Sequence, residues 1–322
     1  STKSITERRD LNLGKITTMT LGSQLLAMAI MIILAKSTGS PWALVAGAIA
    51  TSMLQCLFSH FLLPGNSNQL QFKITIAKNI LKKSKWILLS SPITFLQSNI
   101  EVIILGGLVS ATQLGNYMIA YLLANVVHQV ASNLSGNIFF PGFSSSARSG
   151  TNTISHQYIK FQLVSDAIIV TAAGLILSSG ETIVGILFDP RYASAGSILK
   201  YLSIGLVGLR YHVIESLIHS SGNFRLGTYI SAIRLISLSI GTYVGFSIGG
   251  LTGAAVGVGL SWFSVWPIFI WSRSQFIKSN WKIEFAAIAF FVIGYGLGQL
   301  VTELVRDTLH NSLDCVLDVS PA

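Results

Sequence analysis

The sequence predicts an all-α integral membrane protein, and three observations support this class. Only 10% of the 322 residues are charged, 51% are hydrophobic and the mean hydropathy is +0.63, so a water-soluble chain of this length would lack the polar surface to cover itself. The apolar runs last about 20 residues, the length of helix that spans a hydrocarbon core. In lipid each backbone N–H and C=O must be paired within its segment, and runs this long exceed what a barrel strand needs. The spans are therefore expected to be helices.

Nine apolar runs follow one another along the chain. Two longer polar stretches, the lysine-rich residues 64–85 and the Ser/Gly/Asn-rich residues 141–160, are expected to connect helices on the cytoplasmic side. Tryptophans stand at several span ends, where an amphipathic indole favours the headgroup layer. These are Trp42, Trp86, Trp271 and Trp281. The expected spans are residues 16–35, 41–63, 86–108, 113–138, 161–180, 194–218, 226–248, 250–271 and 283–304.

The basic residues predict the orientation of these spans. If residues 1–15 are cytoplasmic, the cytoplasmic segments hold fifteen Lys and Arg residues and the opposite face holds only three, as the positive-inside rule requires. The fifteen are Lys3, Arg8, Arg9, Lys15, Lys73, Lys78, Lys82, Lys83, Lys85, Arg148, Lys160, Arg225, Arg273, Lys278 and Lys282, and the three are Lys36, Arg191 and Arg306. Topology thus explains the net charge of +9. No nucleic-acid partner is expected, because no basic run interleaves with aromatic residues on a polar segment.

The chain shows no catalytic motif in the structural context that its chemistry requires. There is no G-x-x-x-x-G-K-[ST], no H-E-x-x-H and no G-x-S-x-G at a strand-to-helix turn. We therefore expect a protein that is not an enzyme and that uses no cofactor or metal. The glycines Gly249, Gly253 and Gly257, and the pair Gly294 and Gly298, follow G-x-x-x-G spacing at apolar runs. This spacing predicts close helix packing rather than a nucleotide loop.

Ionisable residues at membrane depth are the candidates for function, because they are costly in lipid unless they face a cavity or a partner. Lys200 and Arg210 lie in one span and Arg234 in the next. Three basic groups on adjacent helices suit an anion better than a hydrophobic cation. We therefore expect Lys200, Arg210 and Arg234 to bind substrate. The acidic residues within spans are Glu101, Asp166 and Glu215.

Helical geometry relates some of these groups. His212, Glu215 and His219 follow at steps of three and four and share one helical face, whereas Arg210 lies about 140° from Glu215 at about 100° per residue. Arg210 therefore need not be neutralised by Glu215. The alternative is that Arg210 or Arg234 pairs across helices with Glu101 or Glu215, or extends to the headgroups.

The fourth span carries a polar stripe on an otherwise apolar helix. Asn125, His128, Gln129, Asn133 and Asn137 follow at spacings of three, one, four and four. A stripe of this kind is expected to face a hydrated cavity, which makes Asn125, Gln129 and Asn133 candidates for substrate binding. The alternative for each member is a hydrogen bond between helices without a ligand.

Five stretches, in this order, resemble the polysaccharide exporter (oligosaccharide flippase) branch of the multidrug/oligosaccharidyl-lipid/polysaccharide exporter superfamily, and the resemblance runs along nearly the whole chain. No single stretch is diagnostic, but the ordered set is specific. The stretches are SPWALVAG at residues 40–47, KWILLSS at 85–91, ILGGLVSATQLGNY at 104–117, FFPGFS at 139–144 and FDPRYASAG at 188–196.

The resemblance implies twelve to fourteen helices in two lobes around a central cavity, with this chain beginning at the fifth helix of an N-terminally truncated transporter. Residues 1–63 would be the last two helices of the N-terminal lobe, and 64–85 a cytoplasmic linker between lobes. Residues 86–272 would form the six-helix C-terminal lobe. Residues 273–322 would add an extra helix and a periplasmic tail.

The resemblance also implies that the protein moves undecaprenyl-pyrophosphate-linked oligosaccharide repeat units across the bacterial inner membrane by alternating access, for exopolysaccharide or O-antigen synthesis. Membrane lipids, H⁺ or Na⁺ as coupling ion and other polysaccharide export proteins are the further partners expected. Glu101, Glu215 and Asp166 are the candidates for ion coupling, by depth alone. Where relatives often have an Asp-Arg pair in the third span, this sequence has Glu101-Val102.

Two other functions compete with this one. A drug/cation antiporter of the same superfamily would present acidic and aromatic residues to its cavity, whereas the deep residues here are mainly basic. A membrane polysaccharide polymerase would have a large periplasmic loop with paired catalytic groups, whereas the external connections expected here are short. Both contrasts favour the flippase.

Overall fold

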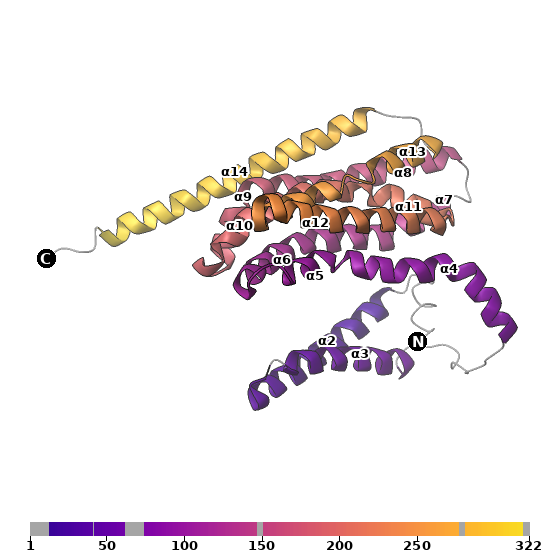
Figure 1. The fold of residues 1–322 in the computed structure, drawn as a ribbon, viewed down its shortest axis with the longest axis horizontal. Coiled ribbons are helices and arrows are strands. Elements are labelled where there is room, and N and C mark those ends of the chain that lie inside the picture. Colours follow the sequence, from indigo (N-terminus) through magenta and orange to yellow (C-terminus); the bar gives the residue numbers. More distant parts are fainter. Residues whose placement is uncertain (1–12, 41, 62–73, 147–150, 277–280, 318–322) are drawn as a thin grey trace. The chain divides into compact units, whose positions relative to one another are not determined.

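The computed structural model describes residues 13–40, 42–61, 74–146, 151–276 and 281–317. All regular elements in these ranges are helices (Figure 1). The chain divides into two compact units, residues 1–79 and 80–322. The all-α membrane fold predicted from composition is confirmed. Parts of the expected connections, residues 64–73 and 147–150, lie outside the described ranges.

The first unit contains α2 (Leu13–Thr38) and α3 (Trp42–Phe61), which pack against each other as a hairpin. Gly39 has a φ of 61° directly after α2, a left-handed conformation that favours glycine. At Gly47 a β-carbon would lie 2.9 Å from the β-carbon of Met31, so the two helices approach closely there. The outward faces carry exposed leucine, isoleucine and methionine side chains, as expected of helices that face lipid.

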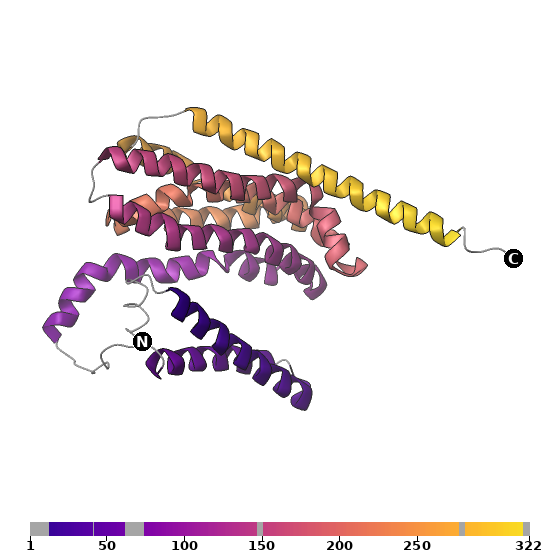
Figure 2. The same ribbon diagram turned by 180° about the vertical axis from the view of Figure 1, so that it is seen from behind.

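The second unit is a bundle in which α9 packs between α10 and α14, and α10 also contacts α6 and α12 (Figures 1 and 2). Its first part comprises α4 (Ile74–Gln97), α5 (Ile100–Gly106), α6 (Ala111–Leu134), the π-helix η1 (Ser135–Phe139), α7 (Phe140–Ser146), α8 (Thr151–Ser165), the π-helix η2 (Asp166–Val170) and α9 (Thr171–Leu187). The 3₁₀-helix η3 (Pro190–Tyr192), α10 (Ala193–Leu206), the 3₁₀-helix η4 (Val207–Tyr211), α11 (His212–Ser220), α12 (Phe224–Ser261), α13 (Trp266–Phe276) and α14 (Trp281–Leu317) follow.

Both polar stretches expected to connect helices are partly helical themselves. The helix α4 begins at Ile74, inside the stretch expected to link the lobes, and α8 begins at Thr151, ten residues before the span predicted there. Polar residues at the ends of these helices extend beyond the apolar segment, so hydropathy underestimates the helix lengths. The third span is bent by 46° between residues 97 and 100, where α4 ends and α5 begins.

Six helical stretches among the described residues are long and apolar enough to cross a membrane, and the bent α4–α5 pair makes a seventh. The six are residues Thr17–Thr38, Trp42–Phe61, Ile154–Leu187, Pro190–Ser220, Phe224–Ser274 and Lys282–Asp307. The stretch Phe224–Ser274 contains the two spans predicted at 226–248 and 250–271. The helix α6 occupies the place of the predicted fourth span but falls short in hydropathy, because of its polar stripe.

The helix α12 folds back on itself at Gly249 and Gly250, whose backbones leave the helical conformation, with a φ of 59° at Gly250. The two arms then run side by side with almost no space between their backbones. A β-carbon on Gly253 would lie 2.2 Å from the carbonyl oxygen of Gly245, and one on Gly257 would lie 2.0 Å from that of Gly241. The predicted packing role is therefore confirmed for Gly253 and Gly257 but wrong for Gly249, which makes the turn.

The last helix, α14, packs against α9 through a similar glycine seam. A β-carbon on Gly294 would lie 2.1 Å from the carbonyl oxygen of Thr171, and one on Gly298 would lie 2.6 Å from that of Leu175. The packing predicted for this G-x-x-x-G pair is confirmed. Such small residues allow the close backbone contact that drives helix association in lipid.

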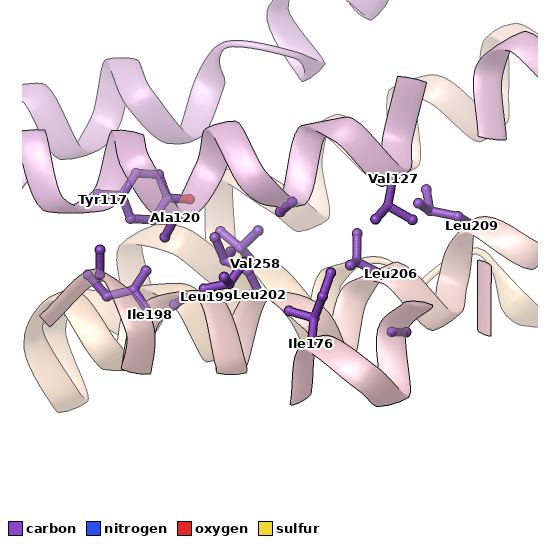
Figure 3. Packing of buried hydrophobic residues seen from close by; sticks show 14 of the residues in the cluster. Tyr117, Ala120, Val127, Ile176, Ile198, Leu199, Leu202, Leu206, Leu209 and Val258 are labelled. Atoms are coloured by element: carbon purple, nitrogen blue, oxygen red, sulfur yellow. The ribbon is translucent and has the colours of Figure 1, made fainter. Parts of the chain in front are cut away.

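Buried apolar side chains form two clusters in the second unit. The larger joins α5, α6, α9, α10 and α12, and Figure 3 shows Tyr117 and Ala120 of α6 facing Leu199, Leu202 and Val258. The smaller gathers residues of η1, α7, α8, α11 and α13 around Phe139, Phe143 and Phe269. The two clusters fix the relative positions of α6, α11 and α12, which form the site described below.

Candidate functional site

A cavity of about 560 Å³ lies between α4, α6, α11 and the first arm of α12. On each helix the lining residues follow one another mainly at steps of three or four, so each helix presents one face to the cavity. The wall residues are Ser90, Thr94, Gln97 and Ser98 of α4, Asn125, His128, Gln129 and Ser132 of α6, His212, Glu215 and His219 of α11, and Phe224, Gly227, Thr228, Ser231 and Arg234 of α12, with Trp262 directly after its second arm. Among the described residues, Glu215 is the only acidic side chain in this wall.

Arg234 is the basic centre of this cavity. Its side chain is only 5% exposed, and its Cζ lies 4.8 Å from the ring centre of Trp262 and 5.9 Å from that of Phe269. A guanidinium over an aromatic face is stabilised without using its N–H donors. One amino group lies 3.8 Å from Oε2 of Glu215, beyond hydrogen-bond distance, and Nε has no hydrogen-bond partner in the described part of the chain. Arg234 therefore retains donor capacity.

Three histidines surround the same space. The ring of His128 lies 4.7 Å from that of Trp262, and Nδ1 of His212 lies 3.7 Å from Oε2 of Glu215. His219 stacks on Phe224 at the cytoplasmic end predicted for α12, with ring centres 6.1 Å apart. The expectation that His212, Glu215 and His219 share one helical face is confirmed, because all three line the cavity.

Only part of the polar stripe on α6 lines the cavity. Asn125 and Gln129 line the cavity together with His128, whereas Asn133 is exposed and does not line it. Lys200 is exposed on α10 and also lies outside the cavity wall. Of the six residues predicted to bind substrate, the structure therefore brings together Arg234, Asn125 and Gln129.

Arg210 lies instead in a second, separate cluster. Its Nε and one amino group donate to the two oxygens of Asp166 at 3.0 and 2.8 Å, and the other amino group donates to Glu284 at 2.6 Å. Glu284 also accepts from Arg273 at 2.6 Å, and Gln162 donates to Asp166 at 2.9 Å. All the ion pairs of Arg210 are close and directional, which is the strong form of this interaction.

This cluster differs from the sequence-based alternatives for Arg210. Arg210 was expected to bind substrate, with a deep glutamate as the alternative partner, but its partners are Asp166 at the start of η2 and Glu284 in the first turn of α14. Sequence reasoning did not single out Glu284 or Arg273. One signal was present, because an acid in the first turn of a helix and a base in the last turn of the preceding one both complement the helix dipoles.

The three carboxylates proposed for ion coupling lie in three different surroundings. Asp166 is occupied by Arg210 and Gln162, and Glu215 lies in the cavity wall. Glu101 is buried and accepts a hydrogen bond from the hydroxyl of Tyr117. It borders a space of about 20 Å³, roughly one water molecule, which shares Asn125, His128 and Trp262 with the main cavity.

A groove of about 760 Å³ runs along the α12 hairpin, lined almost entirely by apolar and glycine residues. Its wall includes Ser237 and Gly241, which follow Arg234 by three and seven residues. These spacings place the groove one to two helical turns beyond Arg234, on nearly the same side of the helix. Arg234 therefore stands between a polar cavity and an apolar groove.

Together the fold and the cavity define a multi-pass membrane protein with a polar, partly buried chamber inside a helical bundle. The family described as polysaccharide biosynthesis protein matches residues 1–197. The chain belongs to this family, which confirms the resemblance found in the sequence.

Two known proteins extend this comparison. The lipopolysaccharide biosynthesis protein WzxC of Escherichia coli K12 is 22% identical over 239 residues, which are 71% of this chain and 48% of that protein. The chain thus spans about half the length of this curated relative. A solved structure of the lipid II flippase MurJ in an inward closed conformation covers 90% of this chain with a TM-score of 0.56 at 14% identity, and 67% of MurJ is covered. This likeness shows a shared fold.

Proposed function

We propose that the chain forms part of a flippase that moves undecaprenyl-pyrophosphate-linked oligosaccharide repeat units across the bacterial inner membrane by alternating access, for exopolysaccharide or O-antigen synthesis. The observation that carries the proposal is Arg234, a buried arginine with an unpaired Nε in the wall of a polar cavity. A guanidinium binds phosphate oxygens with charge-assisted, directional hydrogen bonds. Arg234 is therefore proposed to bind the pyrophosphate of the cargo.

The other walls suit the remaining parts of such a molecule. The amides of Asn125 and Gln129 and the hydroxyls of Thr94 and Ser132 offer donors and acceptors to sugar hydroxyls. The apolar groove of α12 begins one turn from Arg234 and offers a surface to the polyprenyl chain. Polar cavity, arginine and groove follow one another in the order of sugar, phosphate and lipid.

Orientation and energy supply complete the proposal. The predicted cytoplasmic start places the cavity in the cytoplasmic half of the bundle, because α11 ends and α12 begins on that side. In the proposed mechanism the movement is coupled to H⁺ or Na⁺ by Glu215 in the cavity wall or by Glu101 at the small adjoining space. In the proposed domain organisation, residues 1–63 belong to the N-terminal lobe, 86–272 form the C-terminal lobe, and 273–322 form an extra helix with a periplasmic tail.

Complementation tests this function. The full-length gene is expected to restore surface polymer in a flippase-deficient strain, and Arg234→Ala is expected to reduce the polymer at least tenfold at unchanged protein level in the membrane. The matched control is Arg225→Ala, because Arg225 lies nine residues earlier on the same helix but is exposed. Restored drug resistance without polymer would contradict the proposal and support the antiporter.

A further inference from the structure

The pairing of Arg234 with Glu215 is unusually loose for buried charges. The nitrogen–oxygen distance is 3.8 Å, although the two side chains are only 5% and 13% exposed. Neither Nε of Arg234 nor Oε2 of Glu215 has a hydrogen-bond partner in the described residues. In the cluster of Arg210, by contrast, every pairing distance is between 2.6 and 3.0 Å. The loose pair therefore leaves the strongest directional contacts of Arg234 unused.

The other titratable groups that face the cavity with Glu215 are one arginine and three histidines. His212 and His219 lie on its own helix, Arg234 faces it from α12, and His128 faces the same cavity from α6. The carboxylate thus lies beside Arg234, the permanently charged base of the described cavity wall, where an anionic ligand would also bind. A ligand phosphate at Arg234 and the carboxylate of Glu215 would repel each other there, because like charges at this range oppose each other most strongly in a poorly hydrated site.

We infer that Glu215 is an internal competitor that occupies the phosphate-binding donors of Arg234 weakly and is displaced by an anionic ligand. The inference rests on the proposed function for the identity of that ligand as a lipid diphosphate. Competition of this kind lowers the affinity of the site. A transport site requires this, because a cargo that binds too tightly is not released.

If Glu215 competes with the ligand, removing its negative charge should tighten diphosphate binding. A purely structural role of Glu215 would not predict tighter binding. The probe is inorganic diphosphate, titrated by calorimetry into the purified full-length protein in detergent. Glu215→Gln is expected to lower the Kd about tenfold, equivalent to ~1.4 kcal/mol. Arg234→Ala is expected to weaken binding roughly 10–100-fold, both alone and combined with Glu215→Gln. The matched control is Glu181→Gln, which removes an exposed carboxylate of α9 outside the cavity and should leave the Kd unchanged.

A second variant controls for the possibility that Glu215→Gln does not fold. Glu215→Asp keeps the charge but shortens the side chain by one methylene, so its Kd is expected to lie between those of the wild type and Glu215→Gln. An unchanged or weaker Kd for a folded Glu215→Gln, or no binding to any variant, would overturn the competition. If the Kd values follow the expected order but the gene fails to restore polymer, the proposed function fails while the competition stands.

Discussion

The two buried arginines of the second unit differ in how fully their hydrogen bonds are used. Arg210 is held by Asp166 and Glu284 through close, directional contacts, whereas Arg234 stacks on Trp262 and meets Glu215 only at 3.8 Å. Two carboxylates offset the charge of Arg210 and accept from three of its five N–H donors, so its main effect is expected to be on stability. An undersaturated arginine beside a cavity can bind an anion. We therefore propose a structural role for Arg210 and a ligand-binding role for Arg234.

The largest effect is expected from Arg210→Ala. The change leaves the fully buried carboxylate of Asp166 without its cation, and breaking a buried pair in this way costs about 3–5 kcal/mol. We expect a large fall in melting temperature in detergent and less folded protein in the membrane. The control is Arg306→Ala, an exposed residue of α14 whose loss should leave the melting temperature nearly unchanged. Equal melting of Arg210→Ala and the wild type would refute the structural role.

Arg234→Ala should show the opposite pattern. The change removes only a loose contact with Glu215 and the stacking on Trp262, worth about 0.5–2 kcal/mol, so the melting temperature should fall less than in Arg210→Ala. The lost charge-assisted hydrogen bonds are worth about 1.5–3 kcal/mol to a bound anion, or roughly a 10–100-fold loss of diphosphate affinity. Melting curves and calorimetry on the same sample measure both quantities. A fall in stability as large as that of Arg210→Ala would remove the distinction between the two arginines.

The double variant Asp166→Ala/Arg210→Ala sharpens the comparison further. Removing the orphaned carboxylate together with its cation is expected to restore about 1–3 kcal/mol relative to Arg210→Ala alone, since Glu284 keeps its pair with Arg273. The melting temperatures of both variants provide the measurement. No recovery would mean that packing, rather than the unpaired charge, dominates the loss.

The smallest effect is expected at the glycine seam that holds α14 on α9. Gly294→Ala places a methyl group against the carbonyl of Thr171 and should cost about 1–3 kcal/mol. Gly296→Ala is the control, because a β-carbon there meets nothing within 4 Å. Diphosphate affinity should not change in either variant, since α14 does not line the cavity. A loss of diphosphate affinity in Gly294→Ala but not in Gly296→Ala would show that the contact between α9 and α14 influences the cavity.

Much of the fold follows from the sequence because membrane helices are specified locally. Length and hydropathy located the spans, and glycine spacing marked the seams at Gly253, Gly257, Gly294 and Gly298. The shared face of His212, Glu215 and His219 followed from helical periodicity. The polar ends of α4 and α8 were missed, since hydropathy detects the lipid-facing segment and not the whole helix.

The pairing of charges could not be predicted in the same way. Arg210 lies in the 3₁₀-helix η4, so the assumption of 100° per residue does not hold between it and Glu215. Its partners lie 44 and 74 residues away along the chain, and only the packing of η2, η4 and α14 brings them together. In the sequence, Arg210 and Arg234 are both single arginines within apolar runs. Their different surroundings arise from tertiary structure.

The position of Glu284 on α14 also has a consequence for biogenesis. Asp166, Arg210, Arg273 and Glu284 are neutral together, but α14 is synthesised after the elements that carry the other three residues. Until α14 is inserted, Asp166 is the only acid of the four, and the cluster carries an unbalanced positive charge. Insertion of α14 supplies both Glu284 and the glycine seam against α9, so completion of this part of the bundle depends on α14.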